Sequence, residues 1–136
     1  MTALAKDRTT RERTGNRRAF GVKAATLIYA GSIVCLDAND LAVPGAVATT
    51  LKAVGVAVAK ADNSAGANNA INVEAATGIF RFNNSASTDE ITIGEIGADC
   101  YIVDDQTVAK TDGSSARSVA GKIFDVEADG VWVKFE

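Results

Sequence analysis

KIFDVEADGVWVKF, residues 122–135, has the pattern of a β-hairpin. Two largely apolar runs, residues 122–126 and 131–135, flank the polar connection EADG at 127–130. Asp129-Gly130 at the end of this connection favours the positive φ that a tight turn needs. We therefore predict two antiparallel strands joined by a short turn at this end of the sequence.

Similar short runs of Val, Ile and Ala, punctuated by glycine, cover most of the chain before this hairpin. Loops are predicted at the polar stretches 61–69 and 83–89. Strands are predicted over residues 25–30, 32–37, 41–43, 52–60, 70–75, 79–82, 99–103 and 107–110. About nine or ten short strands with regular turn spacing are typical of an all-β fold. The predicted fold class is a small antiparallel β-barrel or sandwich.

Helical structure is predicted at one place at most. Thr92-Ile93-Gly94-Glu95 matches a capping box, in which the fourth residue bonds back to the first. Gly94 and Gly97 oppose a longer helix. One short helical turn near residues 92–97 is therefore expected.

The first 19 residues differ in character from the rest. They hold six cations against two acids, a net charge of +4, whereas residues 20–136 carry a net charge of −7. We interpret residues 1–19 as an extended basic N-terminal arm and residues 20–136 as a compact β-domain. The cations proposed to contact a partner are Lys6, Arg8, Arg11, Arg13, Arg17 and Arg18.

Three interpretations of the arm remain open on charge alone. It docks on a protein surface, it neutralises nucleic-acid phosphates, or it is a solvated tail. The acidic body opposes a close approach to a polyanion, and no aromatic stacking platform is visible. Docking on a protein partner is therefore favoured over nucleic acid.

The sequence contains no histidine, which limits the catalytic and metal-binding chemistry open to the protein. This absence removes Ser–His–Asp and Cys–His catalysis, histidine-ligated zinc and the usual near-neutral general base. Cys35 and Cys100 each lie in an apolar run and lack CxxC spacing, so we expect two reduced, buried side chains. No enzyme activity and no cofactor are predicted. Neither a membrane span nor a secretory signal is predicted, so synthesis in the cytoplasm is expected.

Two acidic clusters are candidate sites. Asp125, Glu127, Asp129, Gly130 and Glu136 have nearly the spacing of a calcium-binding loop. That loop needs flanking helices, whereas the flanks here have strand patterns, so a hairpin turn is favoured. Asp104-Asp105, near Asp99, would suit acid–base or metal chemistry, but its place between two apolar runs favours a solvated turn.

Two aromatic residues in the last predicted strand are candidate anchors of the core or of a subunit interface, Trp132 and Phe135. Strand alternation places Trp132 on the face opposite Val131 and Val133. A single tryptophan closes the end of a barrel or anchors an interface, and the core is favoured for it.

The order of these pieces resembles the capsid cement, or head decoration, proteins of tailed bacteriophages, including those of Mu-like phages and prophages. The resemblance covers nearly all of residues 21–136. It is carried by IYAGSIVCLDANDLAVPGA (28–46), AVGVAVAKADNSAG (53–66), VEAATGIFRFNNSA (73–86) and IGADCYIVDDQTVAKTDGSSARSVAGKIFDVEADGVWVKF (96–135). These are strand and turn patterns, and the arm contributes little to them.

The resemblance implies a non-enzymatic virion protein made in the host cytoplasm. Such a protein is a small β-barrel or sandwich that sits on the outer capsid surface as a homotrimer, with the major capsid protein as partner. The extended arm would reach across neighbouring capsid subunits. Membrane binding is not expected. Three alternatives stay open: another head-completion or tail protein, a basic-armed nucleic-acid-binding module, and an enzyme using Asp104 and Asp105.

Overall fold

The computed structural model describes residues 2–136, and the regular structure in it is almost entirely antiparallel β-strand. One five-stranded sheet has the order β1-β7-β5-β3-β4, a second has the order β10-β9-β11-β12-β8, and β2 pairs with β6. The strands are β1 (Arg17–Gly21), β2 (Thr26–Ile28), β3 (Ile33–Leu36), β4 (Ala42–Pro44), β5 (Lys52–Ala57), β6 (Ala61–Asn63), β7 (Asn72–Ala76), β8 (Gly78–Phe82), β9 (Asp99–Ile102), β10 (Val108–Ala109), β11 (Val119–Glu127) and β12 (Gly130–Phe135). The all-β antiparallel fold class is confirmed.

Both five-stranded sheets are open but curled, because their edge strands meet at one point. In the first sheet, Val22 after β1 bridges Ala42 in β4, and Lys23 N donates to Ala42 O over 3.1 Å. In the second, Asn83 after β8 bridges Thr107 before β10, and Val108 N donates to Asn83 O over 3.0 Å. Curling of this kind lets each sheet enclose side chains on its inner face.

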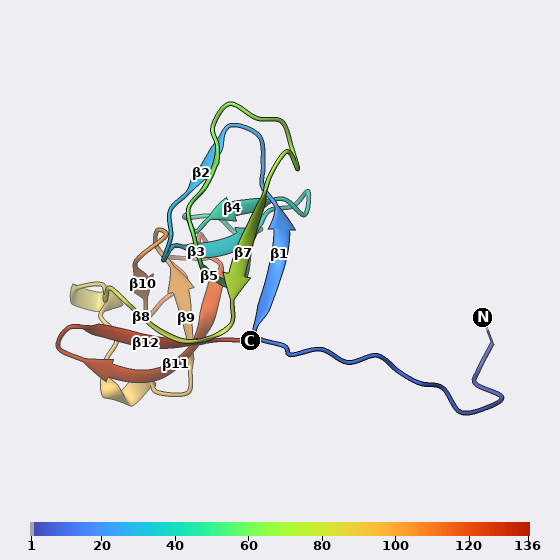
Figure 1. Cartoon of the computed structure of the whole chain (residues 1–136). Coiled ribbons are helices and arrows are strands. Elements are labelled where there is room, and N and C mark those ends of the chain that lie inside the picture. The colour runs from blue at the N-terminus through green and yellow to red at the C-terminus, as the bar shows by residue number, and fades with distance from the viewer. Residues whose placement is uncertain (1) are drawn as a thin grey trace.

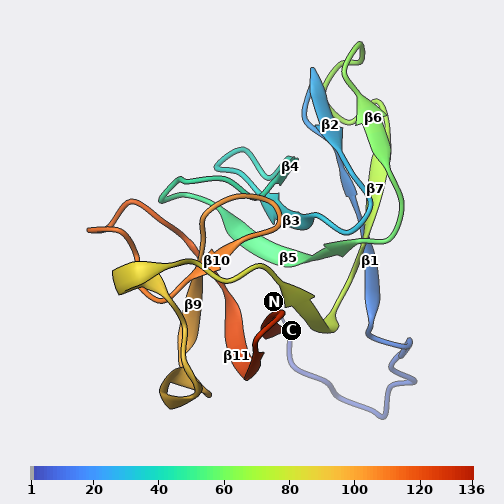
Figure 2. The ribbon, with the colours of Figure 1, turned by 90° about the vertical axis from the view of Figure 1, so that its left-hand side faces the viewer.

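Two clusters of buried side chains fill these curled sheets. The larger one joins the two sheets, because Ile33, Cys35 and Val56 of the first sheet belong to the same cluster as Val131 and Val133 of the second. The smaller cluster lies within the first sheet and under the β2–β6 ribbon. Figures 1 and 2 place that ribbon at one end of the body and the second sheet at the other. The shared cluster makes the two sheets one folding unit.

Two strands, β6 and β1, were not predicted from the sequence. β6 lies in the predicted loop 61–69, where Asn63 is buried and its side-chain nitrogen donates to the carbonyls of Val22, Lys23 and Ala67. β1 begins at Arg17, three residues before the predicted start of the body, and pairs with β7 from Arg17↔Ala76 to Gly21↔Asn72. Both strands are short and polar, so their pairing partners rather than their own residues define them.

The structure has two short 3-10 turns rather than one at most. The predicted turn spans Ile93–Glu95, and the Glu95 carboxylate accepts hydrogen bonds from Thr92 N and Thr92 Oγ1, each over 2.6 Å. The second turn, Ser87–Asp89, lies in the predicted loop 83–89. Side chains from a distant loop hold it: Asp89 accepts a hydrogen bond from the Thr111 hydroxyl and lies 3.3 Å from the Arg117 guanidinium.

This Asp89 contact predicts an acid-dependent loss of stability. The hydrogen bond from Thr111, followed by the bond and charge of Arg117, lowers the pKa of Asp89 below its ordinary value. Such a carboxylate stabilises the fold above its unfolded pKa of about 4, and this contribution is lost as the pH falls through the lower folded pKa. Asp89→Asn should therefore lower the urea midpoint at pH 7, and the difference from wild type should shrink below about pH 4.

Urea titrations of both proteins between pH 7 and pH 3 would measure this effect. The exposed Asp40→Asn serves as the control, because asparagine tolerates the positive φ of 62° at that position. A pH-independent gap between Asp89→Asn and wild type would contradict the role of the charge.

Candidate functional site

The arm is the part of the molecule with the least contact to the rest. Residues 2–16 form no strand, their side chains are exposed, and the segment runs away from the body (Figure 1). It is anchored where it meets β1: Thr77 N donates to Asn16 O over 2.9 Å, and Thr77 Oγ1 donates to Gly15 O over 3.4 Å. The free part of the arm therefore ends at about Thr14.

The structure divides the six predicted contact cations into two groups. Lys6, Arg8, Arg11 and Arg13 are exposed on the arm. The other two belong to β1 and contact the body. Arg17 Nη1 lies 3.6 Å from Glu74 Oε1 on β7, a half-exposed ion pair.

Arg18 ties β1 to a strand that is not its neighbour. Its Nη2 donates to Val54 O on β5 over 3.0 Å, and its guanidinium lies 5.5 Å from the centre of the Phe20 ring. β7 separates β1 from β5 in the sheet, so this side chain crosses over one strand. Arg18 therefore stabilises the first sheet, while the cations of residues 2–14 remain free for a partner.

The two aromatic residues of β12 lie on opposite faces. Phe135 is buried and packs with Phe80 and Phe82, whose ring centres lie 6.3 and 5.7 Å away. Trp132 is half-buried on the outer face, outside both core clusters, with the Arg81 guanidinium 5.9 Å from its ring centre. The core position favoured for Trp132 is wrong, whereas its place opposite Val131 and Val133 is confirmed. Alternation along the strand leaves the outer face as its only position.

Beside Trp132 lies a surface depression that the sequence did not reveal. It has a volume of about 310 Å³ and is lined by Ile79, Phe124, Asp125, Glu127 and Trp132, and we call it the outer hollow. Its cause is a β-bulge between Ile123 and Asp125, where the register with β12 shifts. Phe124 is 55% exposed because it follows the buried Ile123 in the strand, and the bulge adds the exposed Asp125 next to it. The only signal in the sequence is the broken alternation of Ile123-Phe124-Asp125-Val126.

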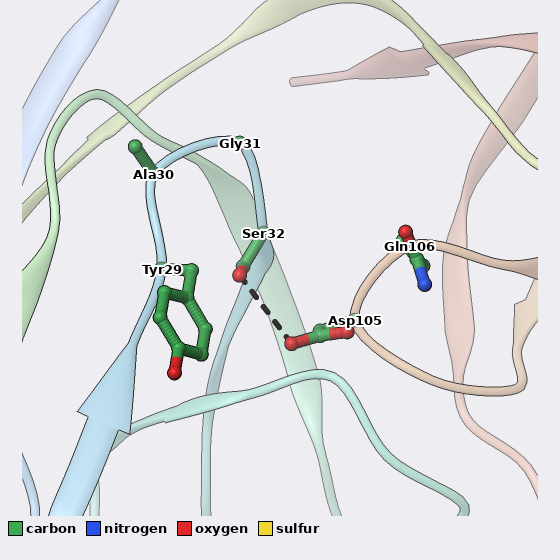
Figure 3. Close-up of a pocket in the computed structure, with 6 residues that line it drawn as sticks. All are labelled: Tyr29, Ala30, Gly31, Ser32, Asp105 and Gln106. Atoms are coloured by element: carbon green, nitrogen blue, oxygen red, sulfur yellow. Dashed lines mark hydrogen bonds between the residues drawn. The ribbon is translucent and has the colours of Figure 1, made fainter.

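Asp104 and Asp105 form a turn, as predicted. Asp104 Oδ1 accepts from Gln106 N over 2.9 Å, while the Asp105 main-chain oxygen accepts from Ile33 N over 2.9 Å. The Asp105 carboxylate accepts from Ser32 Oγ over 3.4 Å beside a pocket of about 440 Å³ (Figure 3). These bonds link the β9–β10 turn to the start of β3, which gives Asp105 a structural part between the two sheets.

The calcium-like spacing at residues 125–136 falls on β11 and β12, which confirms the hairpin interpretation. Asp129 lies in the turn, 3.9 Å from Arg81, and Glu136 lies 3.8 Å from Lys134. Within residues 2–136, no group of three or more His, Cys, Asp or Glu side chains is placed to hold a metal ion. Neither acidic cluster is therefore assembled for coordination in the described part of the chain.

Both cysteines are free and buried in the larger core cluster, as predicted. Burial raises the pKa of the Cys35 and Cys100 thiols to about 12. The thiolate is the reactive form of cysteine, so these side chains are unreactive at neutral pH in the folded protein.

The described residues thus form an all-β protein with a free basic arm and an acidic, partly apolar outer face. Among residues 2–136, no helix has the length and apolar character needed to cross a bilayer. Comparisons with models of protein families, with curated proteins and with solved structures found no match.

Proposed function

We propose that this chain is a non-enzymatic structural protein of a phage virion. It binds the outer surface of the capsid as a cement or decoration protein, and it does so as a trimer. The observation that carries the proposal is the free, basic arm of residues 2–14 attached to the edge strand of an acidic body. The resemblance of residues 21–136 to capsid cement proteins supplies the partner.

The arm supplies the reach of such a protein. Thirteen extended residues span about 40 Å at about 3.3 Å per residue. This reach would let the arm contact capsid surface beyond that covered by the body. On the shell the arm would order by strand addition and by pairing its cations with acidic side chains. Ordering costs conformational entropy, which the new contacts offset.

The body supplies an anchorage for the arm. The arm continues directly into β1, whose five residues pair with β7, and Arg18 adds its bond to Val54 O on β5. A pull on a capsid-bound arm would act along β1, and the hydrogen bonds between β1 and β7 would resist it together. Three bodies held together would present three arms, so release would require all three to detach.

Deletion of residues 2–14 tests the arm's part in binding. The deletion keeps Gly15 and Asn16, whose carbonyls accept the bonds from Thr77, and leaves β1 intact. We expect a folded body whose apparent affinity for undecorated cognate capsids is roughly 100-fold lower, since several arm contacts are lost together. Sedimentation of capsid-bound protein and cryo-imaging of the particles would measure occupancy.

Matched variants distinguish the effect of the arm's charge on capsid binding from the effect of its length. Replacing Lys6, Arg8, Arg11 and Arg13 with glutamine keeps the arm but removes its free cations, and it should weaken binding in a salt-dependent manner. Arg17→Gln is the control, because Arg17 is already paired with Glu74. Wild-type occupancy by the deleted protein would refute the arm's role, and density confined to the tail or neck would refute cement function.

A further inference from the structure

We propose that the outer hollow binds the arm of a second copy of this chain. Leu4 would occupy its apolar part, and Lys6 and Arg8 would face its acidic rim. The inference goes beyond capsid binding, because it concerns contacts between copies in solution. It can therefore fail or succeed independently of the proposed function.

The hollow has an apolar base drawn from three adjacent strands. Ile79 comes from β8, Trp132 from β12 and Phe124 from β11. Ile79 and Phe124 are both exposed. Aromatic residues in a depression are typical of the centre of a protein interface. A side chain of leucine size would remove these apolar surfaces from water.

The rim of the hollow carries two carboxylates that are free to pair. The cations of this face already have partners: Arg81 lies near Asp129, Lys122 near Asp99 and Lys134 near Glu136. Asp125 and Glu127 line the hollow, and neither belongs to any ion pair within residues 2–136. A cationic segment entering the hollow would supply the missing partners.

The arm has the complementary pattern. Leu4 is its one large aliphatic side chain within residues 2–16 and is 73% exposed. Lys6 and Arg8 follow at alternate positions. The free arm bends at Ala5 and Lys6, and extension of this segment would bring all three side chains to the same face. An extended segment of residues 4–8 therefore presents one apolar group followed by two cations, as the hollow and its rim require.

A second copy fits this arrangement better than the chain's own arm. The arm leaves the body at Thr77 and runs outward, away from the sheets (Figure 1). Return to its own hollow would require the segment to reverse direction. Exchange between copies joins different surfaces head to tail, so it can close into a ring such as a trimer.

Cross-linking between two differently tagged copies tests the contact. One copy carries Leu4→Cys and the other carries Phe124→Cys; the native cysteines remain, since both are buried. Under mild oxidation we expect a mixed disulfide-linked dimer. The control pairs Leu4→Cys with Val58→Cys. Val58 is exposed and directly follows β5 of the first sheet, away from the hollow. Equal cross-linking to Val58→Cys would overturn the proposal.

A double variant carrying both cysteines in one chain distinguishes exchange from folding back. Exchange gives linked dimers and larger species, whereas closure on the same chain gives an internal disulfide at monomer mass. Predominance of the internal product would overturn the proposal.

Sedimentation in the absence of capsids measures the strength of self-association. Phe124→Ser and Leu4→Ser should each weaken self-association at least about tenfold. Asp125→Lys and Glu127→Lys together should weaken it as well, and adding Lys6→Glu and Arg8→Glu should restore part of the loss, because the charges on both sides of the contact are then reversed. A wild-type protein that remains monomeric at all concentrations would overturn the proposal. Normal decoration of capsids by that protein would leave its cement function standing, with the trimer forming only on the shell.

Discussion

Phe135→Ala is expected to lower the free energy of unfolding by about 3–5 kcal/mol, the usual cost of truncating a buried phenylalanine. Phe135 is 4% exposed and belongs to the cluster shared by the two sheets. Its ring contacts Phe82 edge-on, at an interplanar angle of 70°, and lies beside Phe80. Removing it leaves a cavity between two rings that cannot easily collapse, because β8 and β12 are fixed by pairing from Val131↔Phe82 to Phe135↔Gly78.

Urea denaturation followed by circular dichroism would measure this change. Phe124→Ala is the matched control, since it removes the same group from a position that is 55% exposed. We expect it to cost less than about 1 kcal/mol at concentrations where the protein is monomeric. Similar losses for the two variants would contradict the assignment of Phe135 to the core.

Gly55→Ala is expected to cost about 3 kcal/mol, from backbone strain and overpacking together. Gly55 has a φ of +146°, which side-chain-bearing residues rarely adopt. A Cβ atom at this position would lie 2.5 Å from the main-chain oxygen of Ala76 on β7. Because that neighbour is backbone held by the β5–β7 pairing at Val56↔Ala76, it cannot move aside without loss of the pairing.

Gly31→Ala distinguishes the cost of backbone strain from the cost of overpacking. Gly31 also has a positive φ, +86°, but no atom lies within 4 Å of its would-be Cβ. This variant should therefore show only the conformational cost, about 1 kcal/mol. Equal destabilisation by the two substitutions, measured as shifts in the urea midpoint, would contradict the close approach of β5 and β7.

Much of the fold could be predicted because strand pairing leaves local signals. The terminal hairpin, the β9–β10 hairpin and the capping box at Thr92 all follow from alternation and turn residues within a few positions of one another. β6 carried no such signal: its Asn63 is buried because two distant carbonyls, those of Val22 and Lys23, and the nearby carbonyl of Ala67 accept its hydrogen bonds. A polar residue of this kind is indistinguishable from a loop residue until those partners are known.

The candidate surfaces were predicted only in part, because they also depend on contacts between residues that are far apart in the sequence. The basic character of the arm is evident from the sequence, but its boundary at Asn16 depends on bonds to Thr77, far along the chain. Arg18 looks like any other cation of the arm until Val54 O is found 3.0 Å from it. The outer hollow depends on a bulge that places Asp125 next to Phe124, opposite Trp132.

The sequence by itself determined the antiparallel strands, the closing hairpin and the separation of a basic segment from an acidic body. These properties depend on side-chain periodicity, turn chemistry and charge, which act over a few residues. Only the tertiary structure decided which cations are free, that the strand face carrying Trp132 is the outer one, and where an apolar depression meets unpaired carboxylates. Those properties depend on which strands become neighbours, and that is a matter of long-range packing rather than of local pattern.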